Sequence, residues 1–360
     1  MPDHALSRSG TPAAAAPRVG WVDAAKGVCI VLVVMMHATL GVGEAMGGEG
    51  FMHSVVAFAA PFRMPDFFLI SGLFLARVID RDWRTYGDKR ILHFVYFYLL
   101  WLVVQSVVKV GSVSGGSLAG FVEHLVVSLV EPFSTLWFVY MLAIFSIVAK
   151  LVRRVNPVVL LAIAAALEIA PIHTGSLLVD EFCARFVYFV AGWRLAPAIF
   201  RLAAAGQARP AAALACLAAW AAVNGALALA TVEVSGATTT LAALPVVSLA
   251  LGAAGAAAIV VVSALLARTP AAAPFTYAGR HSIAVYLAFF FPMAATREIL
   301  IRTGIVEDVG LVSLVVTLVA VIAPLVLERI VRRTPLSFLF ERPAFARLTP
   351  RPRAVVQPAE

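Results

Sequence analysis

Charged side chains are scarce in this sequence, and their scarcity excludes an ordinary soluble fold. Of the 360 residues, 13% are charged and 62% are hydrophobic, and the mean hydropathy is +0.94. A soluble domain of this size exposes far more charge. Apolar runs of about 18 or more residues recur along the whole chain, as is typical of transmembrane helices. The composition therefore predicts an integral membrane protein.

Cysteine is also sparse, which excludes a disulfide framework. The three cysteines, Cys29, Cys183 and Cys216, lie in apolar runs, and no CxxC spacing suggests a metal site. We interpret them as small packing residues in helices. We expect no bound metal and no bound cofactor.

The chain is basic, but the placement of its charges argues against nucleic acid as a partner. It carries 28 Lys and Arg against 20 Asp and Glu, a net charge of +8. The basic residues lie in short segments between apolar runs, as the positive-inside rule requires of a membrane protein. The expected environment is therefore the bilayer of the cytoplasmic (inner) membrane, crossed several times.

The hydropathy pattern predicts an all-α bundle of about ten transmembrane helices with both termini in the cytoplasm. The expected spans are 19–41, 54–77, 91–111, 134–151, 156–172, 179–199, 211–231, 240–267, 280–301 and 309–331. Segment 112–133 is less apolar and is predicted to be an external loop with a short amphipathic helix on the membrane surface. We expect 1–17 to be a disordered cytoplasmic tail, 18–333 the transmembrane domain, and 334–360 a Pro/Arg-rich cytoplasmic tail.

The first span carries three ionisable residues, Asp23, Lys26 and His37. Lys26 and His37 lie about three turns apart on one helix face, roughly 16 Å along the axis. Asp23 and Lys26 have i, i+3 spacing and can pair. An ionisable residue within the membrane usually has a function. The alternative is that Asp23 and Lys26 anchor the helix at the interface and that His37 makes an interhelical contact.

Three other motifs are weak when each is taken alone. The segment from Arg63 to Gly72 opens the second span and predicts a proline-kinked, closely packed helix. The segment 135–138 is typical of an aromatic anchor at the membrane surface, and 282–286 is typical of ordinary helix packing.

Taken together, the order and spacing of these motifs resemble the acyltransferase-3 family. The motifs are Asp-x-x-[basic]-Gly followed by His in the first span, Pro-x-Phe-Phe-x-x-Ser-Gly in the second, Leu-Trp-Phe in the fourth and Ser-x-x-x-Tyr in the ninth. The resemblance covers about residues 18–331. It implies an integral membrane enzyme that moves an acyl group, often acetyl or succinyl, onto envelope glycans and related molecules.

The resemblance also implies roles for individual residues. It implies a catalytic role for His37, in a motif shared with Lys26 and Asp23. The residues that it implies for acyl-CoA binding are Arg81, Arg84, Lys89, Arg90 and Ser71. The candidates for an acceptor pocket are Arg63, Trp137, Arg185 and Tyr286, with Glu44, Glu168, His173 and Glu181 at its entrance. Glu181 and Arg185 have i, i+4 spacing, so a structural ion pair explains them equally well.

The sequence departs from the family pattern at three places. Lys26 stands where the family has arginine, which keeps the charge and loses the planar fork. His93 stands where a proline often follows the basic run. Phe289 or Phe290 stands where many members have a histidine after the tyrosine.

The function expected from these observations is O-acyl transfer, with cytoplasmic acyl-CoA as co-substrate and a glycan or lipid-linked molecule as acceptor. His37 would be the general base on an acceptor hydroxyl, since neutral imidazole suits that role near pH 7. One alternative is a transporter or flippase of a polar or lipid-linked substrate. Another is a scaffold or sensor with a degenerate site.

A topology reporter tests the predicted sidedness. We expect a reporter inserted in the 81–90 loop to be cytoplasmic and one inserted in 112–133 to be external, because basic loops stay inside. Periplasmic phosphatase and cytoplasmic fluorescence fusions measure this. An external signal from the 81–90 loop would contradict both the orientation and the acyl-CoA site.

Overall fold

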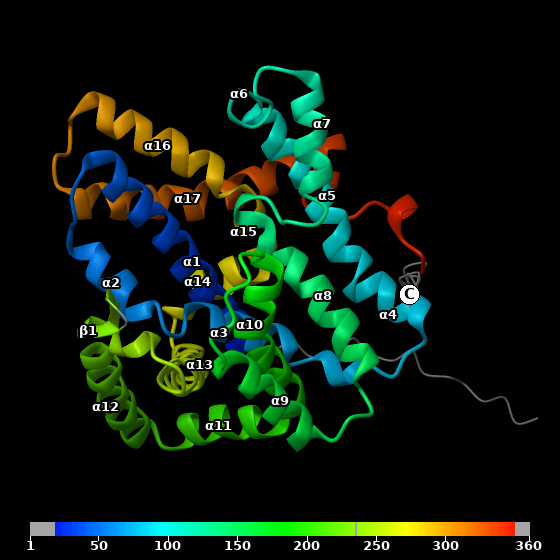
Figure 1. The fold of residues 1–360 in the computed structure, drawn as a ribbon. Helices are drawn as coiled ribbons and strands as arrows, with labels where there is room; N and C mark the ends of the chain where they lie inside the picture. The colour runs from blue at the N-terminus through cyan, green and yellow to red at the C-terminus, as the bar shows by residue number, and fades with distance from the viewer. Residues whose placement is uncertain (1–18, 235, 350–360) are drawn as a thin grey trace, which may run out of the picture.

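The computed structural model describes residues 19–234 and 236–349, so the predicted tail at 1–17 lies outside the described residues. The chain folds as a bundle of helices (Figure 1). The helices are α1 (Gly20–Met46), α2 (Phe51–Ala59), α3 (Arg63–Gly72), α4 (Trp83–Arg90), α5 (Leu92–Val108), α6 (Val110–Val113), α7 (Leu118–Val127), α8 (Trp137–Leu151), α9 (Pro157–Ile169), α10 (Leu177–Arg194), α11 (Ala196–Ala208), α12 (Pro210–Leu229), α13 (Val247–Leu266), α14 (Ala272–Arg280), α15 (Ser282–Ala288), α16 (Phe290–Thr303) and α17 (Val309–Val331). Short 3₁₀ helices are η1 (Leu75–Arg77), η2 (Ser134–Leu136), η3 (Leu241–Ala243), η4 (Pro335–Leu339) and η5 (Ala344–Ala346). The predicted helical membrane fold is confirmed.

Between six and nine helical segments among the described residues are long and apolar enough to be membrane spans. Six helical segments are long and apolar enough to cross a membrane, and three bent helix pairs qualify if each pair forms one span. The fifth predicted span, 156–172, corresponds to α9, which has 13 residues and lies outside both groups. The count of ten, and the common side of the two termini, therefore stay predictions.

Three spans that hydropathy predicted as continuous are bent helix pairs in the structure. The axis turns by 46° between α2 and α3, by 76° between α10 and α11, and by 53° between α15 and α16. Prolines lie in the first turns of α3 and α11. Proline lacks the N–H that would continue a preceding helix, so it favours a new helix start at these positions.

A two-stranded hairpin, β1 (Thr231–Val234) and β2 (Ala237–Thr240), lies between α12 and α13. The predicted spans 211–231 and 240–267 left 232–239 without an assigned structure. The strands pair antiparallel, and Gly236 adopts a positive φ of 81° in the connecting turn. A run rich in threonine and valine favours extended backbone and was the missed signal.

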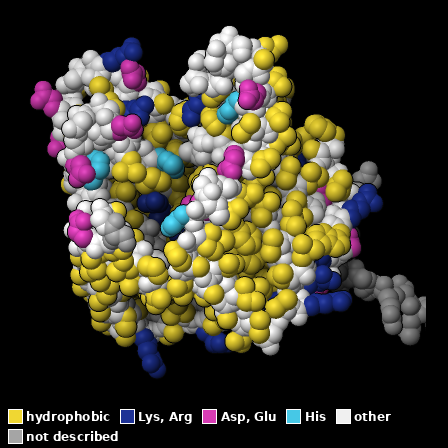
Figure 2. Space-filling view, viewed as in Figure 1, with side chains coloured by type: hydrophobic (Ala, Val, Ile, Leu, Met, Phe, Trp, Pro, Cys, Tyr) yellow, Lys and Arg dark blue, Asp and Glu magenta, His cyan; other side chains and the backbone are white. Residues whose placement is uncertain are grey.

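The side chains on the surface are sorted in the way a bilayer requires. Figure 2 shows a broad band of hydrophobic side chains, with acidic side chains mostly along its upper edge and basic side chains along its lower edge. Leu118, Val122 and Val126 of α7 expose more than half of their surface. Their i, i+4 spacing gives α7 one apolar face, as expected for a helix lying on the membrane.

Helix α1 is packed against α3, α13, α14 and α17. Its crossing with α14 is a backbone contact. A Cβ at Gly27 would collide with the carbonyl of Phe275, and one at Gly279 with the carbonyl of Asp23. Glycines let transmembrane helices approach this closely.

The segment after α17 folds back onto α5. The Tyr96 hydroxyl donates to the Phe338 carbonyl at 3.0 Å, and the Trp101 indole N–H donates to the Leu339 carbonyl at 2.9 Å. The first part of the predicted 334–360 tail is therefore packed on the bundle.

Replacing the glycines at the α1–α14 crossing tests its importance. We expect Gly27→Ala and Gly279→Ala each to destabilise the protein by about 1–3 kcal/mol, because overpacking forces the two backbones apart. Gly20→Ala on the same helix is the control, since nothing lies within 4 Å of its Cβ position. Thermal unfolding in detergent measures the effect. Equal stability of all three variants would contradict a close backbone contact at this crossing.

Candidate functional site

A cavity of about 550 Å³ lies between α1, α3, α5, α8 and the α14–α15 segment. Five residues singled out from the sequence line it together: Asp23, Lys26, Ser71, Arg90 and Tyr286. They come from four separate sequence regions, and the fold brings them together in the lining of one cavity. The cavity is the candidate functional site.

Basic side chains line the cavity near its opening. Arg280 forms an ion pair with Asp23, Nε to Oδ2, at 3.1 Å, and its side chain is 46% exposed, so this pair lies near the opening. Arg77 and Arg90 also line the cavity, and Arg77 lies over the Phe74 ring at 4.8 Å. Arg77 and Arg280 belong to none of the sequence motifs. Their position at the predicted cytoplasmic ends of spans was the available signal.

His93 is a further lining residue that the sequence marked only as a departure from the family pattern. Its ring packs edge-on against Phe97 at 5.1 Å and against Phe94 at 5.5 Å. These contacts place an imidazole next to Arg90 in the wall. The wall can therefore present both guanidinium and imidazole groups to an anionic ligand.

Aromatic residues form the inner end of the cavity. Phe67 and Phe138 stack with ring centres 4.4 Å apart. The Tyr286 hydroxyl donates to the Thr135 carbonyl and accepts the Phe138 N–H at 3.2 Å. The Leu-Trp-Phe motif and the Ser-x-x-x-Tyr motif therefore meet here, although Trp137 itself does not line the cavity.

His37 and Arg63 lie outside the cavity lining. The lining ends at Lys26 on α1 and at Phe67 on α3, and His37 and Arg63 lie further along these helices. The His37 ring lies 5.5 Å from that of Phe289. Arg63 is within electrostatic range of both His37 and Arg185, and its Nε and Nη1 atoms are buried without a hydrogen-bond partner. These three side chains form a second polar group.

Of the other candidates for the acceptor entrance, Glu168 is within electrostatic range of Arg185 and so lies close to this second polar group. Arg185 pairs with Glu181 at 3.1 Å, the i, i+4 contact that the sequence left open. Glu168 accepts a hydrogen bond from the Ser248 hydroxyl at 2.7 Å. Glu44 and His173 are exposed. Figure 2 shows a hollow in the upper half of this face, with histidine and basic side chains visible in it.

The predicted basic cluster is divided in the structure. Arg90 lines the cavity, whereas Arg81, Arg84 and Lys89 are exposed and do not. Because successive helical residues point about 100° apart, neighbours on α4 face different surroundings. The role of the three exposed residues in acyl-CoA binding stays a prediction.

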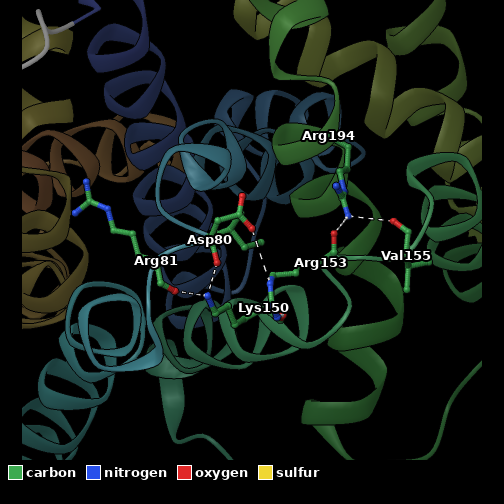
Figure 3. Close-up of polar contacts among 7 residues, drawn as sticks. Asp80, Arg81, Lys150, Arg153, Val155 and Arg194 are labelled. Carbon is green, nitrogen blue, oxygen red and sulfur yellow. Dashed lines mark hydrogen bonds and ion pairs between the residues drawn. The ribbon is translucent and has the colours of Figure 1, made fainter.

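The backbone next to Arg81 is held by a buried lysine. Lys150 is 2% exposed and donates to the carbonyls of Ile79 and Arg81 (Figure 3). The Arg81 guanidinium extends away from this contact (Figure 3). Asp82 then caps α4 by accepting the Thr85 N–H at 2.8 Å, which holds the pKa of Asp82 below its usual range. These contacts fix the start of α4, the helix that presents Arg90.

A second set of contacts in Figure 3 joins this loop to α10. Arg153 lies 3.8 Å from the Asp80 carboxylate, and Arg194 donates to the carbonyls of Arg153 and Val155 at 2.8 and 3.2 Å. Guanidinium groups thus satisfy loop carbonyls that would otherwise lack partners.

Within 19–234 and 236–349, no three His, Cys, Asp or Glu side chains are grouped to hold a metal ion.

Comparison with known proteins gives two matches. A family model for acyltransferase-3, described as an acyltransferase domain, matches residues 19–329. The inner membrane protein YcfT of Escherichia coli (strain K12) is 28% identical over 158 residues, which is 37% of this chain and 44% of that protein. The aligned region thus spans less than half of YcfT. No solved structure matches.

Proposed function

Since this chain belongs to the acyltransferase-3 family, we propose that it transfers an acyl group from acyl-CoA to a hydroxyl of an envelope glycan or related acceptor. The acyl group is acetyl or succinyl, and the enzyme lies in the cytoplasmic membrane with both termini inside. The similarity to an inner membrane protein of Escherichia coli supports this location. Sorting of charged loops supports the orientation.

The observation that carries the proposal is the composition of the cavity. Arg77 and Arg280 are exposed near its opening, Arg90 also lines it, and Phe67, Phe74 and Phe138 supply aromatic lining. Acyl-CoA has a matching polarity, with phosphates at one end and a long, weakly polar arm ending in the thioester. Guanidinium forks bind phosphate oxygens in pairs, so the basic opening suits the nucleotide and the aromatic lining suits the arm.

In the proposed reaction, the acceptor oxygen attacks the thioester carbonyl while His37 removes the hydroxyl proton. A C–O ester bond forms and the C–S bond breaks. The proton passes from His37 to the departing CoA thiolate. No metal or bound cofactor takes part in this step.

The position of His37 sets a condition on this reaction. His37 lies beyond the inner end of the cavity, on the side of Arg63. The acyl end must therefore pass the aromatic residues Phe67, Phe138 and Tyr286, or lodge among them, to meet an acceptor held near His37.

Replacing His37 tests the proposed base. We expect His37→Ala to lower acyl transfer from labelled acetyl-CoA by about 100-fold or more, the usual contribution of a general base. Coenzyme A binding should be retained, because His37 does not line the cavity. Leu40→Ala, at an exposed position on the same helix, is the control. Transfer at the wild-type rate in His37→Ala would exclude this role, and substrate flux without covalent change would favour the transporter alternative.

The divided basic cluster gives a second prediction. We expect Arg90→Ala to weaken coenzyme A binding by about tenfold, since it removes a charge-assisted contact in the cavity wall. Arg81→Ala should weaken binding by less than about threefold, as for an exposed charge. Titration calorimetry on the purified protein compares the two variants. A larger effect at Arg81 would move the donor site to the loop.

A further inference from the structure

The C-terminal segment is joined to α4 by a buried carboxylate. Asp88 is 2% exposed and lies on α4, two residues before Arg90. It accepts hydrogen bonds from Arg342 Nη2 at 2.7 Å, the Leu348 N–H at 2.8 Å and the Thr349 hydroxyl at 2.6 Å. Residues 342–349 therefore form part of the structure around α4.

Arg342 has hydrogen-bonding capacity that the protein leaves unused. Its side chain is 7% exposed, and its Nε and Nη1 atoms are buried without a partner. Leaving a buried charged group short of partners is costly, and buried polar groups are normally satisfied. The hydrogen bond from Nη2 to Asp88 fixes the orientation of the guanidinium group, and Nε and Nη1 remain as unused donors.

The surroundings of Arg342 are strongly positive. Arg342, Arg90 and Arg347 all lie within electrostatic range of His93, and Asp88 is the carboxylate within that range. Arg347 donates to the Arg342 carbonyl at 2.5 and 3.1 Å and lies 3.6 Å from the carboxylate of Glu341. Positive charge thus exceeds negative charge around His93.

This cluster lies between two open spaces. Arg90 and His93 line the 550 Å³ cavity. Arg342 and Arg347 line a separate cavity of about 630 Å³, together with Tyr96 and Glu341. A ligand at this position could extend into the main cavity and still contact the C-terminal segment.

We infer that Arg342, Arg347, Arg90 and His93 form a phosphate-binding site built by the C-terminal segment, and that it holds the phosphate-bearing end of acyl-CoA. The identity of this ligand rests on the proposed function. Arg90 and the unused Nε and Nη1 donors of Arg342 supply charge-assisted hydrogen bonds for phosphate oxygens, and Arg347, held on the Arg342 carbonyl, adds positive charge beside them. Because Asp88 holds Arg342 in place before the ligand arrives, little ordering is needed on binding.

Two variants test the site in the full-length protein in phosphatidylcholine nanodiscs. Arg342→Lys keeps a positive charge opposite Asp88 and removes the unpaired guanidinium donors. Arg347→Gln leaves the Asp88–Arg342 pair intact and remains informative if Arg342→Lys fails to fold. Arg333→Lys is the matched control, since Arg333 is exposed beyond the end of α17. The probes are coenzyme A and inorganic pyrophosphate, each titrated by calorimetry.

We expect Arg342→Lys to raise the Kd for coenzyme A about tenfold and that for pyrophosphate similarly, with an unchanged unfolding temperature. Arg347→Gln should raise both Kd values about threefold or more, and Arg333→Lys should leave them unchanged. In acetyl-transfer assays, Arg342→Lys should raise KM with kcat retained, because it acts on donor binding.

The outcomes separate this inference from the proposed function. Wild-type affinities in both variants, with acetyl transfer intact, would overturn the phosphate site and leave the acyltransferase standing. Pyrophosphate binding that depends on Arg342, in a protein that neither binds nor consumes acetyl-CoA, would support the site and reject the acyltransferase. In that case nanodiscs with phosphatidylglycerol identify the source: weaker pyrophosphate binding in them would point to a lipid headgroup, and unchanged binding would point to a soluble phosphate ligand. No pyrophosphate binding in the wild type would overturn the site.

Discussion

The contact between α1 and α14 at Gly27 and Gly279 determines where the polar groups of the cavity lie. The two backbones touch because neither glycine carries a Cβ. This contact brings Asp23 of α1 within 3.1 Å of Arg280 at the end of α14. Tyr286 follows in α15 and reaches the start of α8 through the Phe138 N–H. A wider crossing would separate the motif of the first span from that of the ninth.

Several charged side chains at the α4 end of the bundle are satisfied internally. Lys150 binds two backbone carbonyls, Arg194 binds two more, and Asp88 accepts three hydrogen bonds. Groups tied in this way cannot easily turn toward a ligand, because breaking their contacts leaves buried partners unsatisfied. The cations that retain free donors are the ones suited to binding. Arg342 is such a cation, and its unused donors distinguish it from Lys150.

Hydropathy predicted the helices well because the bilayer requires long apolar segments. Nine of the expected spans correspond to long helices or bent pairs, but the bends depend on tertiary packing that hydropathy does not report. Motif reasoning singled out Asp23, Lys26, Ser71, Arg90 and Tyr286 for three different roles, and the fold brings all five to one cavity. It could not separate Arg90 from Arg84 and Lys89, because that difference depends on which face of the short helix α4 meets the bundle.

The residues that sequence reasoning missed share one physical cause. Arg77, Arg280 and Arg342 lie at helix ends or beyond them, where a basic residue is explained equally well by membrane orientation. Only the fold shows that two of them turn toward the cavity and that Arg342 is buried against Asp88. The hairpin at 231–240 was missed for a related reason, since a short polar segment between two spans looks like any loop.

The separation of His37 from the cavity bears on how a thioester could be protected in a membrane enzyme. Phe67, Phe138 and Tyr286 lie at the inner end. The Tyr286 hydroxyl is hydrogen-bonded to one backbone group of η2 and one of α8. Water reaching the thioester from the outer side would cause hydrolysis instead of transfer. An apolar aromatic layer excludes water at the point where the donor and acceptor regions meet. In the proposed reaction, the same residues that delay access to His37 therefore favour transfer to a hydroxyl over hydrolysis.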